Sequence, residues 1–295
     1  MTNGQPIIFF GTEDYSLGTL KDIVNSGANV VAVVTKPDAP RGRGQKMSQP
    51  PVKTYATEHN IAVWQPDKLR DIADEIKKLQ PVTGVLVAYG KIIPQSIIDL
   101  FTPGIINVHP SLLPLYRGPS PIEAAIFNRD DRTGVTIMQL EAGMDSGPIY
   151  SQTEVSLSGA ETKWDLYDKL FSLGNNLLID NLERIINGEL QPTPQDDSQA
   201  SYCQMLSKDM SRIDPESMTA AEADAHVRAY LGFPRSRATI DGHDIIITKA
   251  HIGQANENAL ALQCQDANFL VIDELIAPSG KTMTSQAFRL GYLKD

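Results

Sequence analysis

An amide, an imidazole and a carboxylate stand out near the middle of this 295-residue chain. Asn107 and His109 lie two residues apart at the end of an apolar run, and Asp145 lies in the glycine-bracketed loop 143–147. An amide can donate a hydrogen bond to a developing oxyanion, and an imidazole can transfer a proton near neutral pH. A carboxylate can orient that imidazole. Together the three residue types suit acyl transfer to an amine.

The same residues also have a purely structural interpretation, which the residue types alone leave open. Asn and His are frequent at strand ends, and an Asp between glycines is often only part of a turn. No competing chemistry is indicated, because Ser111 is not in a G-x-S-x-G elbow and the cysteines lie far apart. We expect no metal site, since the other histidines lack ligand spacing: His59, His226, His243 and His251.

Buried strands and helices alternate along the first half of the chain, which predicts a doubly wound α/β domain with a mostly parallel sheet. Apolar, β-branched runs predict strands at 6–11, 30–35, 61–64, 83–88 and 104–108, followed by strands at 133–140 and 149–155. Helices are predicted at 15–25, 51–60, 67–79, 94–100 and 164–187. Such sheets bind ligands beyond the carboxyl ends of their strands, which is where Asn107 and His109 fall.

The sequence changes character after residue 187. A stretch rich in Pro, Gln and Asp predicts a linker over 188–205, which separates a catalytic domain at 1–187 from a second domain at 206–295. In the second domain, Thr219 and Glu222 have the spacing of a capping box that opens a helix to about residue 230. Short strands at 238–240, 244–248, 259–263 and 269–275 then predict a small OB-like β-barrel.

Composition narrows the function further. The formal net charge of −10 weighs against broad nonspecific binding to nucleic acid, so no DNA partner is expected. We expect a cytoplasmic protein without membrane association, because the sequence has neither an 18-residue apolar stretch nor a secretory signal pattern. The turn at 11–18 lacks the G-x-G-x-x-G spacing of dinucleotide-binding proteins, so no dinucleotide site is expected there. The basic, glycine-rich loop at 36–46 is either a phosphate or RNA contact or a solvated loop.

Several segments closely resemble the folate-dependent formyltransferases. These are residues 107–114, Arg117-Gly118 and the loop 143–147. The basic loop, with residues 51–53, is similar to the RNA-contacting loop of the methionyl-tRNA formyltransferases within that family. Residues 206–208, 212–214 and 228–230 match the linker and C-terminal segment of the same members. The resemblance runs from Ile7 to about Lys249 and weakens afterwards.

The resemblance implies a formyltransferase fold, with 10-formyltetrahydrofolate as donor and the methionine α-amino group of initiator methionyl-tRNA as acceptor, in translation initiation. It implies that Asn107, His109 and Asp145 form the catalytic set. The folate contacts that it implies come from Ser111, Leu112, Leu113 and Pro114, and from backbone groups near Tyr89, Gly90, Ile92, Gln139 and Gly143. The loop entering the tRNA acceptor end is implied to consist of Arg41, Gly42, Arg43, Gly44 and Lys46. The barrel is implied to bind the tRNA arm, and we expect a monomer.

The chain departs from the family at three places. Pro119-Ser120 replaces two residues that are often alanine, Gln45 replaces an often basic residue, and segment 206–295 has nine Lys and Arg against twelve Asp and Glu. Alternative functions are N-formylation of an amino-sugar nucleotide, folate hydrolysis, and noncatalytic binding of folate or RNA. A small sugar needs no basic arm, and pure binding does not need all three residues of the catalytic set.

Overall fold

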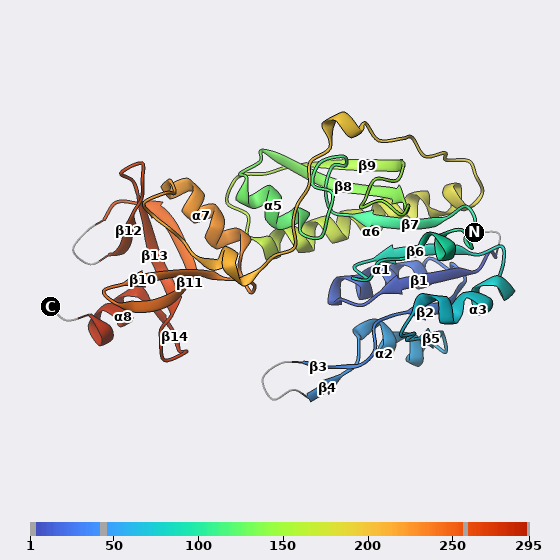
Figure 1. Ribbon diagram of the computed structural model, residues 1–295, viewed down its shortest axis with the longest axis horizontal. Coiled ribbons are helices and arrows are strands. Elements are labelled where there is room, and N and C mark those ends of the chain that lie inside the picture. The colour runs from blue at the N-terminus through green and yellow to red at the C-terminus, as the bar shows by residue number, and fades with distance from the viewer. Residues whose placement is uncertain (1–3, 42–45, 256–258, 294–295) are drawn as a thin grey trace. The chain divides into compact units, whose positions relative to one another are not determined.

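The computed structural model describes residues 4–41, 46–255 and 259–293, which form two compact units (Figure 1). The first unit consists of Met1–Arg117, Gly134–Glu154 and Lys169–Tyr202. The second consists of Gly118–Thr133, Val155–Asp168 and Cys203–Asp295. Each unit is built around its own sheet, and the chain passes between the units several times before residue 203.

A seven-stranded sheet forms the centre of the first unit, in the order β5-β2-β1-β6-β7-β8-β9. Its strands are β1 (Ile7–Gly11), β2 (Val30–Val34), β5 (Ala62–Trp64), β6 (Thr83–Val87), β7 (Ile105–His109), β8 (Arg132–Gln139) and β9 (Ile149–Ser156). The neighbours from β5 through β7 pair parallel, whereas β8 pairs antiparallel with β7. The predicted doubly wound, mostly parallel α/β fold is therefore confirmed.

Helices cover both faces of this sheet (Figure 1). They are α1 (Asp14–Asn25), α2 (Pro51–Glu58), η1 (Leu69–Ile72), α3 (Ala73–Lys78), α4 (Gln95–Ile98) and α6 (Lys163–Ile186). On one face Phe10 of β1 packs in a cluster with Ile76 of α3 and Ile97 of α4. On the other face α6 packs closely against β7 and β8. A Cβ atom added at Gly174 of α6 would lie only 2.8 Å from Val108 Cγ1 of β7.

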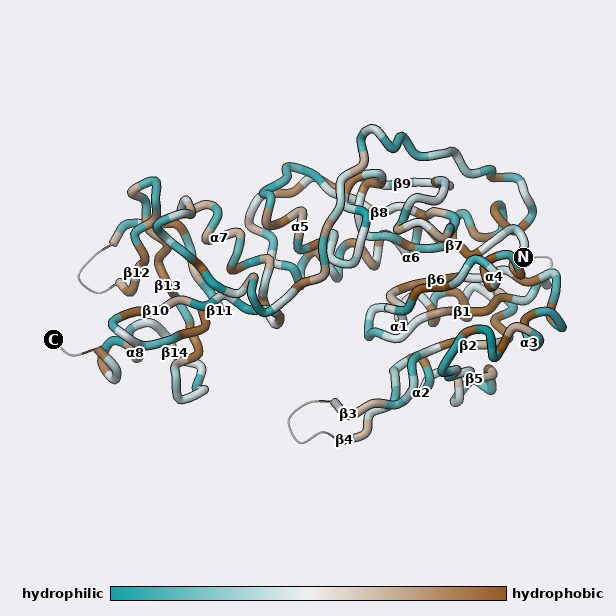
Figure 2. The backbone as a smooth tube through the Cα atoms, in the orientation of Figure 1, coloured by the Kyte–Doolittle hydropathy of each residue, from teal (hydrophilic) through white to brown (hydrophobic). Residues whose placement is uncertain are grey.

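Burial on both faces explains why the strands are apolar without alternation. In β1 all five residues are buried, and β1 and β6 appear largely brown in Figure 2. Burying apolar surface stabilises the fold by roughly 25 cal/mol per Å². This sheet is the rigid support from which the residues after β6, β7 and β8 project.

Some local elements differ from the prediction. The expected helix at 67–79 is divided into η1 and α3, and the expected loop at 36–46 contains a hairpin of β3 (Ala39–Arg41) and β4 (Lys46–Ser48). The short helix α5 (Pro121–Phe127) was not predicted. These elements are three to seven residues long, so they are too short to show a clear hydrophobic period.

The second unit contains a five-stranded antiparallel sheet in the order β10-β11-β13-β12, with β14 paired to β13. Its elements are α7 (Ala220–Ala229), β10 (Ser236–Ile240), β11 (His243–Gly253), β12 (Leu260–Gln263), β13 (Phe269–Ile276), β14 (Thr282–Thr284) and α8 (Ser285–Tyr292). The capping box is confirmed, since Thr219 N donates to Glu222 Oε2 at 2.8 Å. The antiparallel sheet agrees with the predicted small barrel. β14 and α8 were not predicted.

The remaining short helices are η2 (Asp197–Gln199) and η3 (Lys208–Ser211). Among the described residues, no helix is both long enough and apolar enough to cross a membrane.

Candidate active site

Strand β7 places two of the predicted catalytic residues on one side of the sheet. Asn107 and His109 are two residues apart in a strand, so their side chains project in the same direction. Both are almost fully buried, with 6% and 5% of their surface exposed. Because β7 lies between β6 and β8 in the sheet, the backbone that carries both side chains is restrained on both sides.

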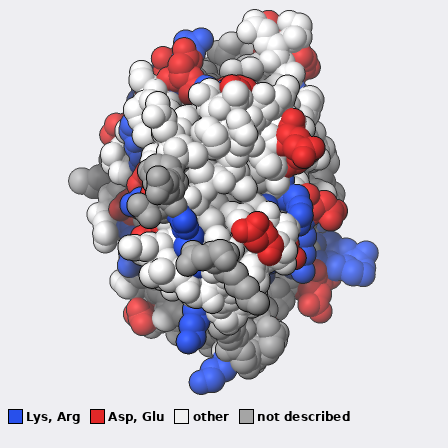
Figure 3. All heavy atoms as spheres, turned by 90° about the vertical axis from the view of Figure 1, so that its left-hand side faces the viewer, with Lys and Arg blue, Asp and Glu red and all other residues white. Residues whose placement is uncertain are grey.

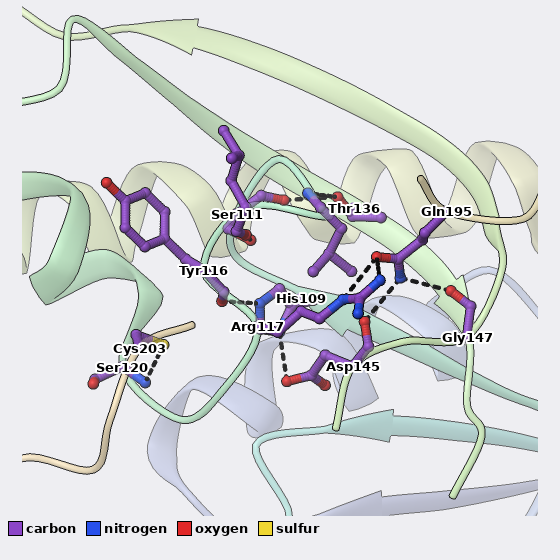
Figure 4. Close-up of polar contacts among 12 residues, drawn as sticks. His109, Ser111, Tyr116, Arg117, Ser120, Thr136, Asp145, Gly147, Gln195 and Cys203 are labelled. Carbon is purple, nitrogen blue, oxygen red and sulfur yellow. Dashed lines mark hydrogen bonds and ion pairs between the residues drawn. The ribbon is translucent and has the colours of Figure 1, made fainter. Parts of the chain in front are cut away.

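The two ring nitrogens of His109 face different groups (Figure 4). Its Nε2 lies 3.0 Å from the carbonyl oxygen of Tyr116, and its Nδ1 lies 3.8 Å from Asp145 Oδ2. A carbonyl oxygen can only accept, so Nε2 is the donor of the first contact. In the neutral ring Nδ1 therefore carries the lone pair, and it faces the Asp145 carboxylate.

The loop between β8 and β9 gives Asp145 an unusual backbone conformation. Its φ of +47° lies in the left-handed region, which non-glycine residues seldom adopt. Two residues later, a Cβ on Gly147 would collide with the backbone oxygen of Gln139, so only glycine fits there. The two features bend the chain tightly, and the Asp145 side chain points toward His109 (Figure 4).

Asn107 provides a donor that the protein itself does not use. Among the residues that the structure describes, its side-chain amide has no hydrogen-bond partner, although it is almost fully buried. An amide that is not used within the described residues and lies two residues before a histidine is a fitting donor for an oxygen that gains negative charge during a reaction.

The segment after His109 is fixed by hydrogen bonds of its own. Thr136 Oγ1 donates to the carbonyl of Ser111 at 2.7 Å and accepts from Leu113 N at 3.1 Å. The Ser111 hydroxyl donates to the Leu115 carbonyl at 2.6 Å. Since the side chains of Ser111 and Leu113 are buried, any folate contact here falls to the backbone and to half-buried Leu112 and Pro114.

The other residues expected near folate fall in different surroundings. Tyr89 follows β6 and is buried, which raises the pKa of its hydroxyl to about 12. Gln139 ends β8 and accepts a hydrogen bond from Tyr150 at 3.2 Å. Gly90 has a φ of +68°, and Ile92 is 89% exposed. Gly143 lies close to Ser146 within the Asp145 loop.

The predicted tRNA loop includes residues of strands β3 and β4, and its residues Gly42, Arg43 and Gly44 lie outside the described residues. The backbone of Arg41 pairs with that of Lys46, and the Lys46 side chain is exposed. Lys53 was expected to resemble an RNA contact. In the structure Lys53 forms an ion pair with Asp38 at 2.8 Å and also donates to Gln65 at 2.9 Å, and its role as an RNA contact stays a prediction. Hydrogen bonding to Lys53 lowers the pKa of Asp38.

Two residues outside the predicted catalytic set lie next to it. Arg117 is 3% exposed and donates to Gln195 Oε1 at 2.8 Å, and Gln195 Nε2 donates to the carbonyls of Asp145 and Gly147 (Figure 4). Burial opposes the charge of Arg117, but hydrogen bonds to Asp197 and Tyr202 outweigh it and raise its pKa. The sequence analysis did not assign either residue a role, because Arg117 appeared only within the Arg117-Gly118 resemblance and Gln195 lies in the expected linker.

The replacement of an alanine pair by Pro119-Ser120 has a structural explanation. The Ser120 hydroxyl donates to the carbonyl of Gln204, and its backbone N–H donates to Cys203 Sγ at 3.3 Å. The serine therefore connects parts of the second unit.

Within the described residues, no group of three or more His, Cys, Asp and Glu side chains is arranged to bind a metal ion.

Comparison with known proteins adds a family and several relatives. The sequence pattern of the formyl transferase family matches residues 7–182. A methionyl-tRNA formyltransferase from Sulfurihydrogenibium sp. is 42% identical, covering 97% of this chain and 96% of the relative. One from Stutzerimonas stutzeri is 38% identical, covering 96% and 93%.

Solved structures support the fold. An N-formyltransferase from Helicobacter canadensis, in complex with folinic acid and dTDP-3-aminofucose, aligns with a TM-score of 0.69 at 21% identity. The alignment covers 91% of this chain and 98% of that one. A 4-N formyltransferase from Francisella tularensis aligns with a TM-score of 0.65 at 22% identity, covering 83% and 97%. At these identities the likeness concerns the fold alone.

Proposed function

The chain belongs to the formyl transferase family and, within it, to the methionyl-tRNA formyltransferases, and we propose that it formylates initiator methionyl-tRNA for translation initiation. The formyl group comes from 10-formyltetrahydrofolate, and the acceptor is the α-amino group of the methionine. The observation that carries this function is the approach of His109 to Asp145, with Asn107 two residues before His109 on β7, in a chain that is 42% identical to a methionyl-tRNA formyltransferase over nearly its whole length.

In this reaction bound 10-formyltetrahydrofolate supplies an activated formyl group. The unpaired amide of Asn107 donates a hydrogen bond to the formyl oxygen as negative charge develops there, an effect worth about 3 kcal/mol for one donor. His109 Nδ1 takes the proton that the attacking amine loses and can return it to the departing nitrogen. Asp145 then faces an imidazolium N–H and stabilises its charge.

The residues of the site fit a folate donor. The buried amide of Asn107 lacks a partner among the described residues, and the side chains of Ile92 and Met144 are exposed near the ends of β6 and β8. We assign folate contacts to Ser111–Pro114 and to residues near Tyr89, Gly90, Ile92, Gln139 and Gly143. We assign no step of the reaction to a metal ion.

The acceptor is assigned from the hairpin β3–β4 and from the relatives. The hairpin carries the basic residues Arg41, Arg43 and Lys46 and is fixed at its base by the Asp38–Lys53 pair. On the face in Figure 3, basic and acidic side chains are scattered among uncharged ones. We propose the hairpin as a cationic contact for the tRNA acceptor end, and residues 206–295 as the part that binds another region of the tRNA.

We further propose that the protein acts as a cytoplasmic monomer with no membrane or DNA partner. We propose residues 1–187 as its catalytic domain, 188–205 as the connection and 206–295 as the tRNA-binding domain. Limited proteolysis followed by mass spectrometry tests this division, which requires the first cuts in the connection to fall between residues 188 and 192, before the bridge from Thr193 to Ile149.

A stoichiometry experiment tests the proposed reaction. Purified protein is mixed with 10-formyltetrahydrofolate and methionyl-tRNA, and both tetrahydrofolate and N-formylmethionyl-tRNA are quantified. Transfer predicts one formylated tRNA for each donor consumed. Donor consumption without formylated tRNA would indicate hydrolysis, and binding of folate without consumption would indicate a noncatalytic module.

A further inference from the structure

Part of the segment expected to be a linker forms hydrogen bonds with the backbone of Asp145 and with Tyr116, whose carbonyl is the partner of His109. Residues 193–202, which we call the clasp segment, all belong to the first unit, as do Asn107, His109 and Asp145. The clasp segment begins with an antiparallel bridge, in which Thr193 and Ile149 exchange two backbone hydrogen bonds of 2.8 Å. The chain enters the second unit at Cys203, immediately after the segment ends.

Gln195 connects this segment to the Asp145 loop through all of its hydrogen-bonding capacity. Its Nε2 donates to the carbonyls of Asp145 at 2.8 Å and Gly147 at 2.7 Å. Its Oε1 accepts from Arg117 Nε at 3.1 Å and from Nη2 at 2.8 Å. An amide offers two donors and two acceptor lone pairs, so every one of them is used here.

The Asp145 loop has a specific need for such a partner. Asp145 occupies the left-handed region with φ +47°, at a cost of about 1 to 2 kcal/mol for a non-glycine residue. The carbonyl of this same residue is one of the two that Gln195 binds. Gln195 therefore fixes the peptide plane that directs the Asp145 carboxylate toward His109.

Ser201 connects the clasp segment, through Tyr116, to His109. Its hydroxyl accepts from Tyr116 N at 2.9 Å, and its carbonyl accepts from Arg117 N at 2.9 Å. The carbonyl of Tyr116 is the partner of His109 Nε2. One segment thus reaches Asp145 through Gln195 and His109 through Tyr116.

The central cation Arg117 completes this network. Its guanidinium donates to Asp197 at 2.6 Å as well as to Gln195, so two residues of the clasp segment share one buried charge. Charge-assisted bonds of this kind are stronger than neutral ones. Removing either partner would leave buried polar groups unsatisfied.

We propose that Gln195 is a positioning residue for formyl transfer: through the Asp145 and Gly147 carbonyls it sets the alignment of Asp145 with His109. The segment leading into the second unit thereby controls the geometry of the catalytic pair. The kinetic part of this proposal rests on the proposed function, whereas the geometric part does not.

The test variant is Gln195→Glu. A glutamate can still accept from Arg117, but it cannot donate to the two loop carbonyls, and its charge repels them. If Gln195 acts only by attaching the segment to Arg117, this variant keeps normal activity. Under the proposal kcat falls about 10- to 100-fold, because small misplacements of catalytic groups are costly, and the KM values for donor and tRNA change less than about threefold.

The matched control is Gln191→Glu, which makes the same replacement at an exposed residue whose amide donates to the Gly188 carbonyl. It is expected to keep the kcat of the unaltered protein. A double-mutant cycle with Asp145→Asn adds a second readout. If Gln195 acts through Asp145, Gln195→Glu causes less than about a twofold further loss in that background. Multiplicative losses would overturn the proposal.

Amide hydrogen exchange separates failure of this proposal from failure of the proposed function. Exchange of residues 143–147 needs no acceptor substrate, and it is expected to quicken at least about tenfold in Gln195→Glu but not in Gln191→Glu. If the unaltered protein does not formylate tRNA but loop exchange responds, only the proposed function fails. If tRNA is formylated but neither kcat nor exchange changes in Gln195→Glu, only the positioning role fails.

Discussion

At the scale of single residues, the two nitrogens of His109 differ in what they can do. Nε2 is bound to the Tyr116 carbonyl, so the exchangeable proton position is Nδ1, which faces Asp145 at 3.8 Å. A distance of 3.8 Å exceeds a direct hydrogen bond but allows a strong charge interaction in a buried place. The Asp145 carboxylate thus lies within the range of a charge interaction with the His109 ring.

Replacement of Asp145 tests this arrangement. Asparagine tolerates the left-handed backbone conformation better than most residues, so Asp145→Asn should fold normally. It lacks the negative charge that stabilises protonated His109. We expect kcat to fall by about 100-fold or more, with little change in the KM for donor, measured by steady-state formyl transfer.

The matched control is Glu141→Gln, which removes an exposed carboxylate four residues earlier and should leave kcat unchanged. Near-normal turnover of Asp145→Asn would remove the Asp145 charge from the mechanism.

Candidate site residues could be selected from the sequence where one short segment contained the signal, and their catalytic roles stay predictions. Asn107 and His109 follow an apolar run, and Asp145 lies between two glycines, so local patterns were sufficient to find them. Gln195 was missed because its importance comes from four hydrogen bonds to residues about 50 and 78 positions away. Hydrogen bonds between such distant polar residues leave no periodicity in a sequence.

At the scale of elements, the hairpin β3–β4 depends on the cluster at its base. Lys53 of α2 binds Asp38 and Gln65, and Gln65 Nε2 donates to the Lys36 carbonyl at 2.8 Å. These contacts fix both the start of the hairpin and the helix that follows it. The positions of the described strands β3 and β4 therefore depend on this cluster.

Lys53→Met should make this hairpin less ordered. Methionine retains the aliphatic part of the side chain but removes the three contacts of the ammonium group. We expect the KM for methionyl-tRNA to rise about tenfold while the KM for the folate donor stays the same, measured by varying each substrate.

Lys78→Met is the control, because it removes a similar charge from the exposed Lys78–Glu75 pair of α3. An equal rise in the tRNA KM of the control would attribute the effect to net charge and would contradict a specific role of Lys53 in ordering the hairpin.

Helix α7 contains a histidine that makes stability depend on pH. His226 is 2% exposed, and burial lowers its pKa from 6.5 to about 4. Its Nε2 donates to the Met210 carbonyl, and its Nδ1 pairs with the Ser236 hydroxyl at 2.8 Å. The folded state therefore keeps the ring neutral under conditions where the unfolded chain binds a proton.

The sign of the effect follows from linkage. The stabilisation is complete above about pH 6.5 and is lost as the pH falls toward 4, since only the unfolded state gains a proton in that window. Between about pH 7 and about pH 4.5, we expect His226 to account for a loss of about 2 to 3 kcal/mol in the free energy of unfolding.

Urea unfolding at these two pH values measures the loss. His226→Gln should shrink the difference by that amount, and His251→Gln, an exposed position, should not. An unchanged pH dependence in His226→Gln would contradict the assignment.

At the scale of the whole molecule, the two compact units do not follow the chain in two simple halves. Helix α5 and the first residues of α6 belong to the second unit, where Phe127 stacks on Tyr230 with ring centroids 5.6 Å apart. Lys163 forms a buried ion pair with Glu123 at 3.3 Å in the same unit. The change of composition after residue 187 predicts a second domain. It does not predict that residues 118–133 and 155–168 belong to the same unit, because that depends on contacts between segments distant in the sequence.

The acceptor is the part of the function that involves the whole molecule, because formyl transfer as a reaction is possible to any well-placed amine. Relatives of the same fold are N-formyltransferases, one of them in complex with dTDP-3-aminofucose. What distinguishes a tRNA acceptor in this protein is the basic hairpin together with the long resemblance to methionyl-tRNA formyltransferases.

The most direct test is therefore a comparison of acceptors. The kcat/KM for formyl transfer from 10-formyltetrahydrofolate is measured with initiator methionyl-tRNA and, separately, with dTDP-3-aminofucose. We predict a ratio of at least about 1,000 in favour of the tRNA, equivalent to about 4 kcal/mol of transition-state discrimination. A ratio near one, or a preference for the amino-sugar nucleotide, would contradict the assignment of tRNA as the acceptor.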